Sequence, residues 1–175
     1  MIRPLLVGIL SCCALLAQSP NTLVSEAKFP WTVVRDNLLK MAEKMPAENY
    51  AFQPTPEIES FGRRMAHIAG ANLFVCQGVM GHKTALARPT ATTKPELIAL
   101  LKQASMACDS AFDSLSDAAA MEKIESHLGG PFPPDATRTK LATLNNMVRH
   151  SNEVYGYMCV YLRLKGIVPP STARE

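Results

Sequence analysis

The chain has 175 residues, of which 47% are hydrophobic and 19% are charged, and its formal net charge is +3. This composition excludes a disordered or collagen-like chain, and the length suits one domain of ordinary size. The positive charges are spread along the sequence, and their densest spot is the pair Arg63 and Arg64, so no basic stripe could follow a nucleic-acid backbone. We therefore expect a globular protein that does not bind nucleic acid.

The first segment, residues 1–17, has the layout of a secretory signal peptide. Arg3 precedes an apolar run from Leu5 to Ala17, which is followed by polar residues. The run is shorter than the roughly 20 residues that span a bilayer. A buried N-terminal helix would lack a capping residue, and acylation of Cys12 or Cys13 would need a lipobox that the preceding residues fit poorly. We expect export, to the periplasm or the medium, without stable membrane insertion once the signal is removed.

Residues 28–170 are expected to form one domain of four helices. Apolar residues recur every three or four positions in four stretches, each bounded by proline or glycine. The predicted helices cover about residues 31–45, 60–80, 95–115 and 139–165. No stretch alternates with period two for long enough to form a strand. The predicted fold class is all-α, a four-helix bundle in which each amphipathic helix buries its apolar face against the others.

Three cysteines remain after removal of the signal: Cys76, Cys108 and Cys159. None belongs to a Cys-x-x-Cys motif, and their spacing does not suit a zinc-thiolate site. In an oxidising compartment one disulfide and one free thiol could form. We favour the alternative that each cysteine fills a small apolar position on a helix, because free cysteine is among the most buried residue types.

Common catalytic motifs are missing from the sequence. It has no nucleotide-binding glycine motif, no HExxH and no nucleophile elbow, and no Glu is followed by His three residues later, as di-iron bundles require. Among the four histidines, only His67 and His150 fall on predicted helices, where imidazoles from facing helices can converge on one ion. Two such histidines are also compatible with structural or surface positions.

Four segments resemble the DinB-like (DinB/YfiT) family, in its small exported branch. They read WTVVRDNLLKMAEKMPAENYAFQPTPE, SFGRRMAHIAGAN, HLGGPFPP and HSNEVYGYMCVYLRLKGIVPPS, and together they span about residues 29–171. The resemblance implies a four-helix bundle, often homodimeric, with a divalent metal held by three histidines. One ligand comes from the second helix and two come from an HxxxH pair on the last helix. Some relatives are hydrolases or thiol-dependent S-transferases.

The sequence departs from the family pattern at one ligand. His67 matches the first ligand and His150 matches the first histidine of the pair, but Val154 stands where the second should be. Residues four apart lie on one helix face, and an isopropyl group has no lone pair to offer a metal. The candidate replacements are Glu153, His127 and Asn146. Because catalytic zinc usually keeps three protein ligands, we expect zinc, nickel or iron to bind weakly or not at all.

Two functions are compatible with these observations. The first is an exported bundle with a degenerate histidine site that is non-catalytic or binds metal weakly, since fold does not imply function. It would pair with a second copy of itself, and a small-molecule ligand between the helices is a further option. The alternative is a metal-dependent hydrolase or thiol S-transferase with a substituted third ligand, in which the ion activates water or a thiol. The sequence assigns no catalytic residue in either case.

Overall fold

The computed structural model describes residues 22–82, 89–124 and 138–173. Its four long helices are α1 (Thr22–Lys44), α2 (Phe61–Val79), α3 (Lys94–Asp113) and α5 (Lys140–Leu164). The short elements are η1 (Ala47–Asn49), α4 (Asp117–Ala120), β1 (Lys123–Ile124), β2 (Arg138–Thr139) and η2 (Pro170–Thr172). The prediction of a mainly helical fold is confirmed, and the segment assigned to a signal peptide lies outside the described residues.

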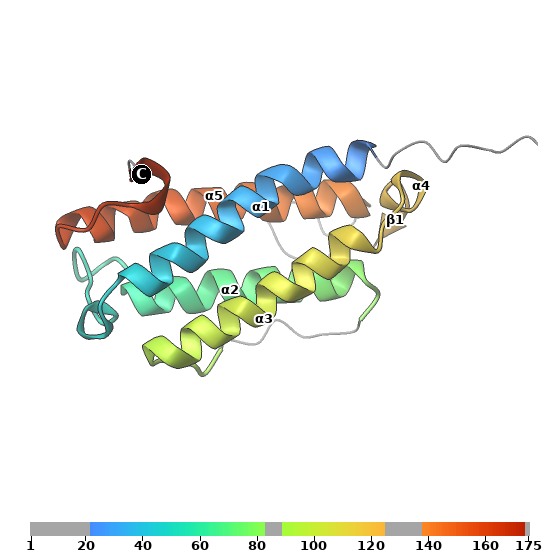
Figure 1. Cartoon of the computed structure of the whole chain (residues 1–175). Helices are drawn as coiled ribbons and strands as arrows, with labels where there is room; N and C mark the ends of the chain where they lie inside the picture. The colour runs from blue at the N-terminus through green and yellow to red at the C-terminus, as the bar shows by residue number, and fades with distance from the viewer. Residues whose placement is uncertain (1–21, 83–88, 125–137, 174–175) are drawn as a thin grey trace, which may run out of the picture.

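The four long helices pack side by side, and consecutive helices do not all run in opposite directions. In Figure 1, α2 and α3 run the same way, whereas α1 and α5 run opposite to them. The contacts agree with this arrangement, because Gly62 at the start of α2 lies against Leu97 near the start of α3. A Cβ at position 62 would also lie 3.1 Å from the backbone oxygen of Tyr50, so a larger residue would require these segments to move apart by a few tenths of an ångström.

Apolar side chains from all four helices fill the space between them. The largest fully buried ones include Trp31, Leu38, Met41, Phe61, Leu101, Phe112, Leu144 and Met158. Their spacing along each helix is the periodicity that predicted the helices. Across the three described ranges, no helix combines the length and the hydropathy needed to cross a membrane.

The first helix begins at Thr22, well before the start near Trp31 that the sequence predicted, and it contains Pro30. Proline removes one helix hydrogen bond and crowds the preceding turn. Burial of Val24 and Trp31 offsets that cost. The carboxylate of Asp117 also accepts hydrogen bonds from the backbone N–H groups of Leu23 and Val24, at 3.2 and 3.1 Å. A residue of another element therefore caps the helix that Pro30 would otherwise shorten.

The cysteines differ from the favoured interpretation. Cys76 of α2 and Cys108 of α3 form a disulfide, with their Cα atoms 4.9 Å apart, and only Cys159 is a free thiol among the described residues. Both bridged residues are fully buried. The expectation that each would fill an apolar position alone was therefore wrong for two of the three. Periodicity placed Cys76 and Cys108 on inward helix faces, but it could not show that the two faces meet.

The structure also contains one short pair of strands, which the sequence did not predict. Lys123 and Ile124 pair antiparallel with Arg138 and Thr139, and this two-residue ladder comes just before α5. Two residues are too few to show an alternating pattern, so strands of this length cannot be predicted from periodicity. The side chain of Thr139 then accepts from the backbone N–H of Ala142 and caps the helix that carries His150.

Candidate functional site

Two histidines from antiparallel neighbours meet at the surface of the bundle. His67 lies on α2 and His150 on α5, and their Nε2 atoms are 3.0 Å apart. The ring planes are nearly perpendicular, at 88°, with centroids 5.2 Å apart. A neutral ring protonated on Nε2 can therefore donate to the bare Nε2 of the other. The two residues that the sequence singled out are thus brought together, with their side chains at the solvent-facing edge of the helix pair.

The geometry of the two imidazoles suits a shared metal ion. Two nitrogens at about 2.1 Å from a tetrahedral ion lie roughly 3.4 Å apart. The observed 3.0 Å between the Nε2 atoms is only a few tenths of an ångström shorter. A small rotation of either side chain would make up the difference. The distance between the two Nε2 atoms is therefore compatible with that between two ligands of one divalent ion.

The surroundings of His150 favour the neutral form of its ring. Burial lowers the pKa of His150, and the positive charge of a protonated His67 lowers it further. Glu153 acts in the opposite direction, with its Oε2 atom 3.9 Å from Nδ1 of His150. Since a metal binds only the neutral imidazole, the lowered pKa extends the pH range over which His150 can act as a ligand.

The third ligand position of the family pattern is occupied by a buried valine. Val154 is only 2% exposed, so its methyl groups pack in the core and offer no donor to an ion. This burial explains why the position is apolar, since a polar ring there would need a partner. Within the described ranges, no group of three or more His, Cys, Asp or Glu side chains is arranged to hold a metal ion.

The candidate replacements for the missing ligand are engaged elsewhere or lie outside the described residues. Glu153 accepts from the hydroxyl of Tyr157 at 2.9 Å and from Arg149 at 3.3 Å. It also stands on the Nδ1 side of His150, away from the Nε2 atoms that face each other. The amide oxygen of Asn146 accepts from Arg149. His127 lies outside the described residues.

Two residues beside the histidines were not singled out by the sequence. Arg64 lies one turn before His67 on α2, and Tyr157 lies two turns after His150 on α5. The hydroxyl of Tyr157 donates to Oε1 of Glu153, whose Oε2 atom lies 3.9 Å from Nδ1 of His150. After burial and His67, the positive charge of Arg64 is a lesser cause of the lowered pKa of His150. Spacings of three and seven residues from the histidines would have identified both positions.

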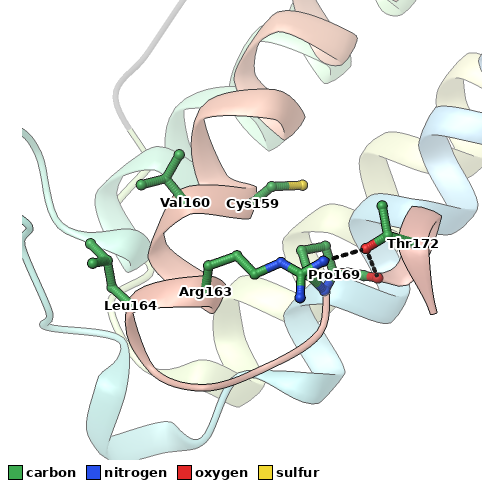
Figure 2. Close-up of a pocket in the computed structure, with 6 residues that line it drawn as sticks. All are labelled: Cys159, Val160, Arg163, Leu164, Pro169 and Thr172. Atoms are coloured by element: carbon green, nitrogen blue, oxygen red, sulfur yellow. Dashed lines mark hydrogen bonds between the residues drawn. The ribbon is translucent and has the colours of Figure 1, made fainter.

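A pocket lies along the last turns of α5 and is shown in Figure 2. It is lined by Cys159, Val160, Arg163, Leu164, Pro169 and Thr172. The Arg163 guanidinium donates to the hydroxyl of Thr172 at 2.8 Å, so this cation is already paired. Burial raises the pKa of the Cys159 thiol, although Tyr155 and Arg163 act against the change, and a thiol with a raised pKa is a poor nucleophile. The histidine pair is therefore the stronger candidate site.

Comparisons with known proteins agree with this architecture. No curated protein matches the chain. The crystal structure of a DinB-like protein from Bacillus cereus ATCC 10987 superposes with a TM-score of 0.70 over 85% of this chain and 97% of that one. The two share 17% sequence identity, so this similarity shows the fold alone. The family model of the DinB superfamily matches residues 31–158, which is most of the chain. The protein therefore belongs to the DinB superfamily.

Proposed function

We propose that this protein is an exported member of the superfamily whose His67–His150 pair is a weak two-ligand site for a divalent transition metal. The observation that carries the proposal is the 3.0 Å approach of the two Nε2 atoms beside a buried valine at the third ligand position. Two imidazoles leave most of the coordination sphere of the ion to water. The ion would supply a positive charge to which a small ligand could bind, and its ready loss argues against a dedicated hydrolytic centre.

The buried disulfide supports export. Disulfides persist in oxidising compartments and are rare in the cytosol, where thiols are kept reduced. The Cys76–Cys108 bond joins two core helices, so it is part of the folded structure and not a surface modification. Together with the signal-like segment at residues 1–17, it favours a periplasmic or secreted location.

The alternative is a metal-dependent hydrolase or thiol S-transferase with a substituted third ligand. It requires a donor that replaces position 154, and Glu153 and Asn146 are both held by Arg149. His127, which the described residues do not include, is the remaining candidate. The alternative would therefore gain support only if removing His127 weakened metal binding as much as removing His67.

Calorimetric titration of the metal-free protein with Zn²⁺ and Ni²⁺ tests the proposal. We expect 1:1 binding with a dissociation constant on the order of 10–100 µM. His67→Ala and His150→Ala should each abolish it. His82→Ala is the matched control, because His82 is an exposed histidine just beyond α2 and belongs to no part of the site. Binding that is tighter than about 0.1 µM would indicate a complete ligand set and favour the enzyme, whereas no binding would show that the pair has no metal role.

We also propose, from the family resemblance, that the protein forms a homodimer. Analytical ultracentrifugation of the purified protein measures it directly. A sedimentation coefficient of a monomer at all accessible concentrations would contradict it.

A further inference from the structure

The guanidinium of Arg64 on α2 has few partners. Its ion pair with Glu59 is loose, with 3.6 Å between Nε and Oε2. The Nε atom is shielded from solvent and makes no hydrogen bond to any described residue. The side chain as a whole is 28% exposed, so its far end reaches the surface. A half-buried guanidinium normally satisfies its donors with carboxylates or carbonyls, and this one does not.

The other charges beside the histidines are already matched. The carboxylate of Glu153 accepts from Tyr157 on one oxygen and from Arg149 on the other. Arg149 in turn donates to Asn146. These contacts neutralise Glu153 and leave it little capacity to bind Arg64. Unlike Arg149, Arg64 thus keeps a shielded N–H donor that no described residue takes up.

The position of Arg64 places this cation next to the imidazoles. It precedes His67 by three residues, so both side chains leave α2 on the flank that faces α5. Tyr157 lies on α5 beside the same pair, since its hydroxyl donates to Glu153, whose Oε2 atom is 3.9 Å from Nδ1 of His150. Its hydroxyl now donates to Glu153 and could donate to a ligand instead. The guanidinium, the hydroxyl and the two imidazoles therefore belong to the same side of the bundle, where α2 and α5 meet.

We propose that Arg64, assisted by the hydroxyl of Tyr157, binds a carboxylate or phosphate group of a small ligand beside the His67–His150 pair. This deepens the metal-site proposal, since it names the class of ligand that the same face would take. A guanidinium presents a planar pair of N–H donors that matches the two oxygens of such a group. The anion would replace the loose contact of Arg64 with Glu59, and a metal on the imidazoles would add a second positive charge at the other end of the ligand.

The test is a titration of the full-length ¹⁵N-labelled protein with acetate and, separately, with inorganic phosphate, at constant ionic strength and pH 8. This pH lies above the ordinary pKa of histidine, about 6.5, so that the contribution of Arg64 is measured. The signals followed are the Nε–H group of Arg64 and the ring protons of Tyr157 and His67. The proposal predicts saturable shifts that are confined to these groups. An effect of phosphate alone, or of acetate alone, identifies which of the two groups the ligand carries.

The variants are Arg64→Gln and Arg64→Lys, and Arg63→Gln is the matched control. Arg63 immediately precedes Arg64 on the same helix and is exposed. Its replacement therefore changes the net charge equally and leaves the groups beside the histidine pair in place. We expect Arg64→Gln to weaken anion binding at least about tenfold and Arg63→Gln to leave it unchanged. Arg64→Lys keeps the charge and most of the packing, and should lose part of the affinity because the paired donors are gone. It also decides the question if Arg64→Gln fails to fold.

The outcomes separate this proposal from the metal site. Absence of a saturable shift with both anions would overturn it, and so would equal weakening by Arg64→Gln and Arg63→Gln. The titration is repeated with Zn²⁺ present. Anion binding that appears only with zinc and is insensitive to Arg64→Gln would place the ligand on the metal alone and would also overturn it. If zinc does not bind, the metal proposal fails, while the metal-free titration still decides whether Arg64 holds an anion.

Discussion

Cys76 of α2 and Cys108 of α3 are covalently joined although 32 residues separate them in the chain. Both are fully buried, so the bond ties two parallel core helices together from within. The chain-entropy model assigns a bridge of this length about 3–4 kcal/mol of stabilisation, chiefly through its restriction of the unfolded chain.

The first prediction is that Cys76→Ser lowers the free energy of unfolding by about 3–4 kcal/mol, as measured by urea denaturation without reductant. Cys159→Ser is the control, because Cys159 is a free thiol, and its effect should stay below about 1 kcal/mol. Peptide mapping under non-reducing conditions should recover Cys76 and Cys108 in one linked pair. Separate alkylated peptides would contradict the assignment.

Restoration of the missing ligand gives the second prediction. Val154→His should strengthen zinc binding by at least about tenfold, because three imidazoles replace two around the ion. In the presence of chelator the variant should be less stable by about 1–3 kcal/mol, since Val154 is buried and the new ring then has no partner. Thermal unfolding with and without zinc measures both effects. Val154→Ala should show the loss of stability without any gain in zinc binding.

A third prediction concerns the protonation of His150. Burial, and then the charge of His67, lower its pKa, so NMR titration should give a midpoint below the ordinary value of about 6.5. Its stabilising contribution is present above the unfolded pKa and is lost as the pH falls toward the folded one, because the unfolded chain binds the proton more readily there. His67→Ala should raise the midpoint only part of the way, since burial remains. An unchanged midpoint in that variant would show that the two rings do not interact.

The fourth prediction concerns a polar pair inside the core. Ser151 donates to the Oδ1 atom of Asn72 at 3.1 Å, both residues are almost fully buried, and the Nδ2 atom of Asn72 has no partner among the described residues. Ser151→Ala should cost about 1–3 kcal/mol, because it leaves a second buried polar atom unpaired. Replacing both, as Asn72→Leu with Ser151→Ala, should cost less than the sum of the single changes. A double-mutant cycle in urea measures the difference, and additive effects would contradict the pairing.

The fifth prediction tests the cap on α1. Asp117→Ala should lower the free energy of unfolding by about 0.5–2 kcal/mol, because the N–H groups of Leu23 and Val24 lose their acceptor. Hydrogen exchange should accelerate in the first turns of α1 and not in α5. Asp113→Ala removes an exposed ion pair with Lys28 on the neighbouring helix, and its effect should stay within about 1 kcal/mol.

The sequence predicted the features that depend on local pattern. Apolar spacing, Pro95 and Gly166 placed α2, α3 and α5 to within one or two residues of their observed bounds. Gly166 has a positive φ of 72°, as a helix-ending glycine requires. The juxtaposition of His67 and His150 followed from the resemblance to the family and not from their spacing.

Features that depend on distant contacts were not predictable in the same way. The residues near Thr22 do not predict a helix that runs through Pro30, because the acceptor that caps this helix, Asp117, is distant in the sequence. The pairing of Cys76 with Cys108 requires α2 and α3 to be parallel neighbours, which no single helix can indicate. In the sequence Arg64 is only one member of a basic pair, and its partial burial and unpaired Nε atom, which distinguish it from Arg63, are tertiary features.

The cap supplied by Asp117 also bears on the order of events during synthesis. The carboxylate follows the amides that it serves by 94 and 93 residues. A ribosome must therefore complete more than half of the polypeptide before the opening turn of α1 acquires its acceptor. Until then that stretch lacks this tertiary anchor.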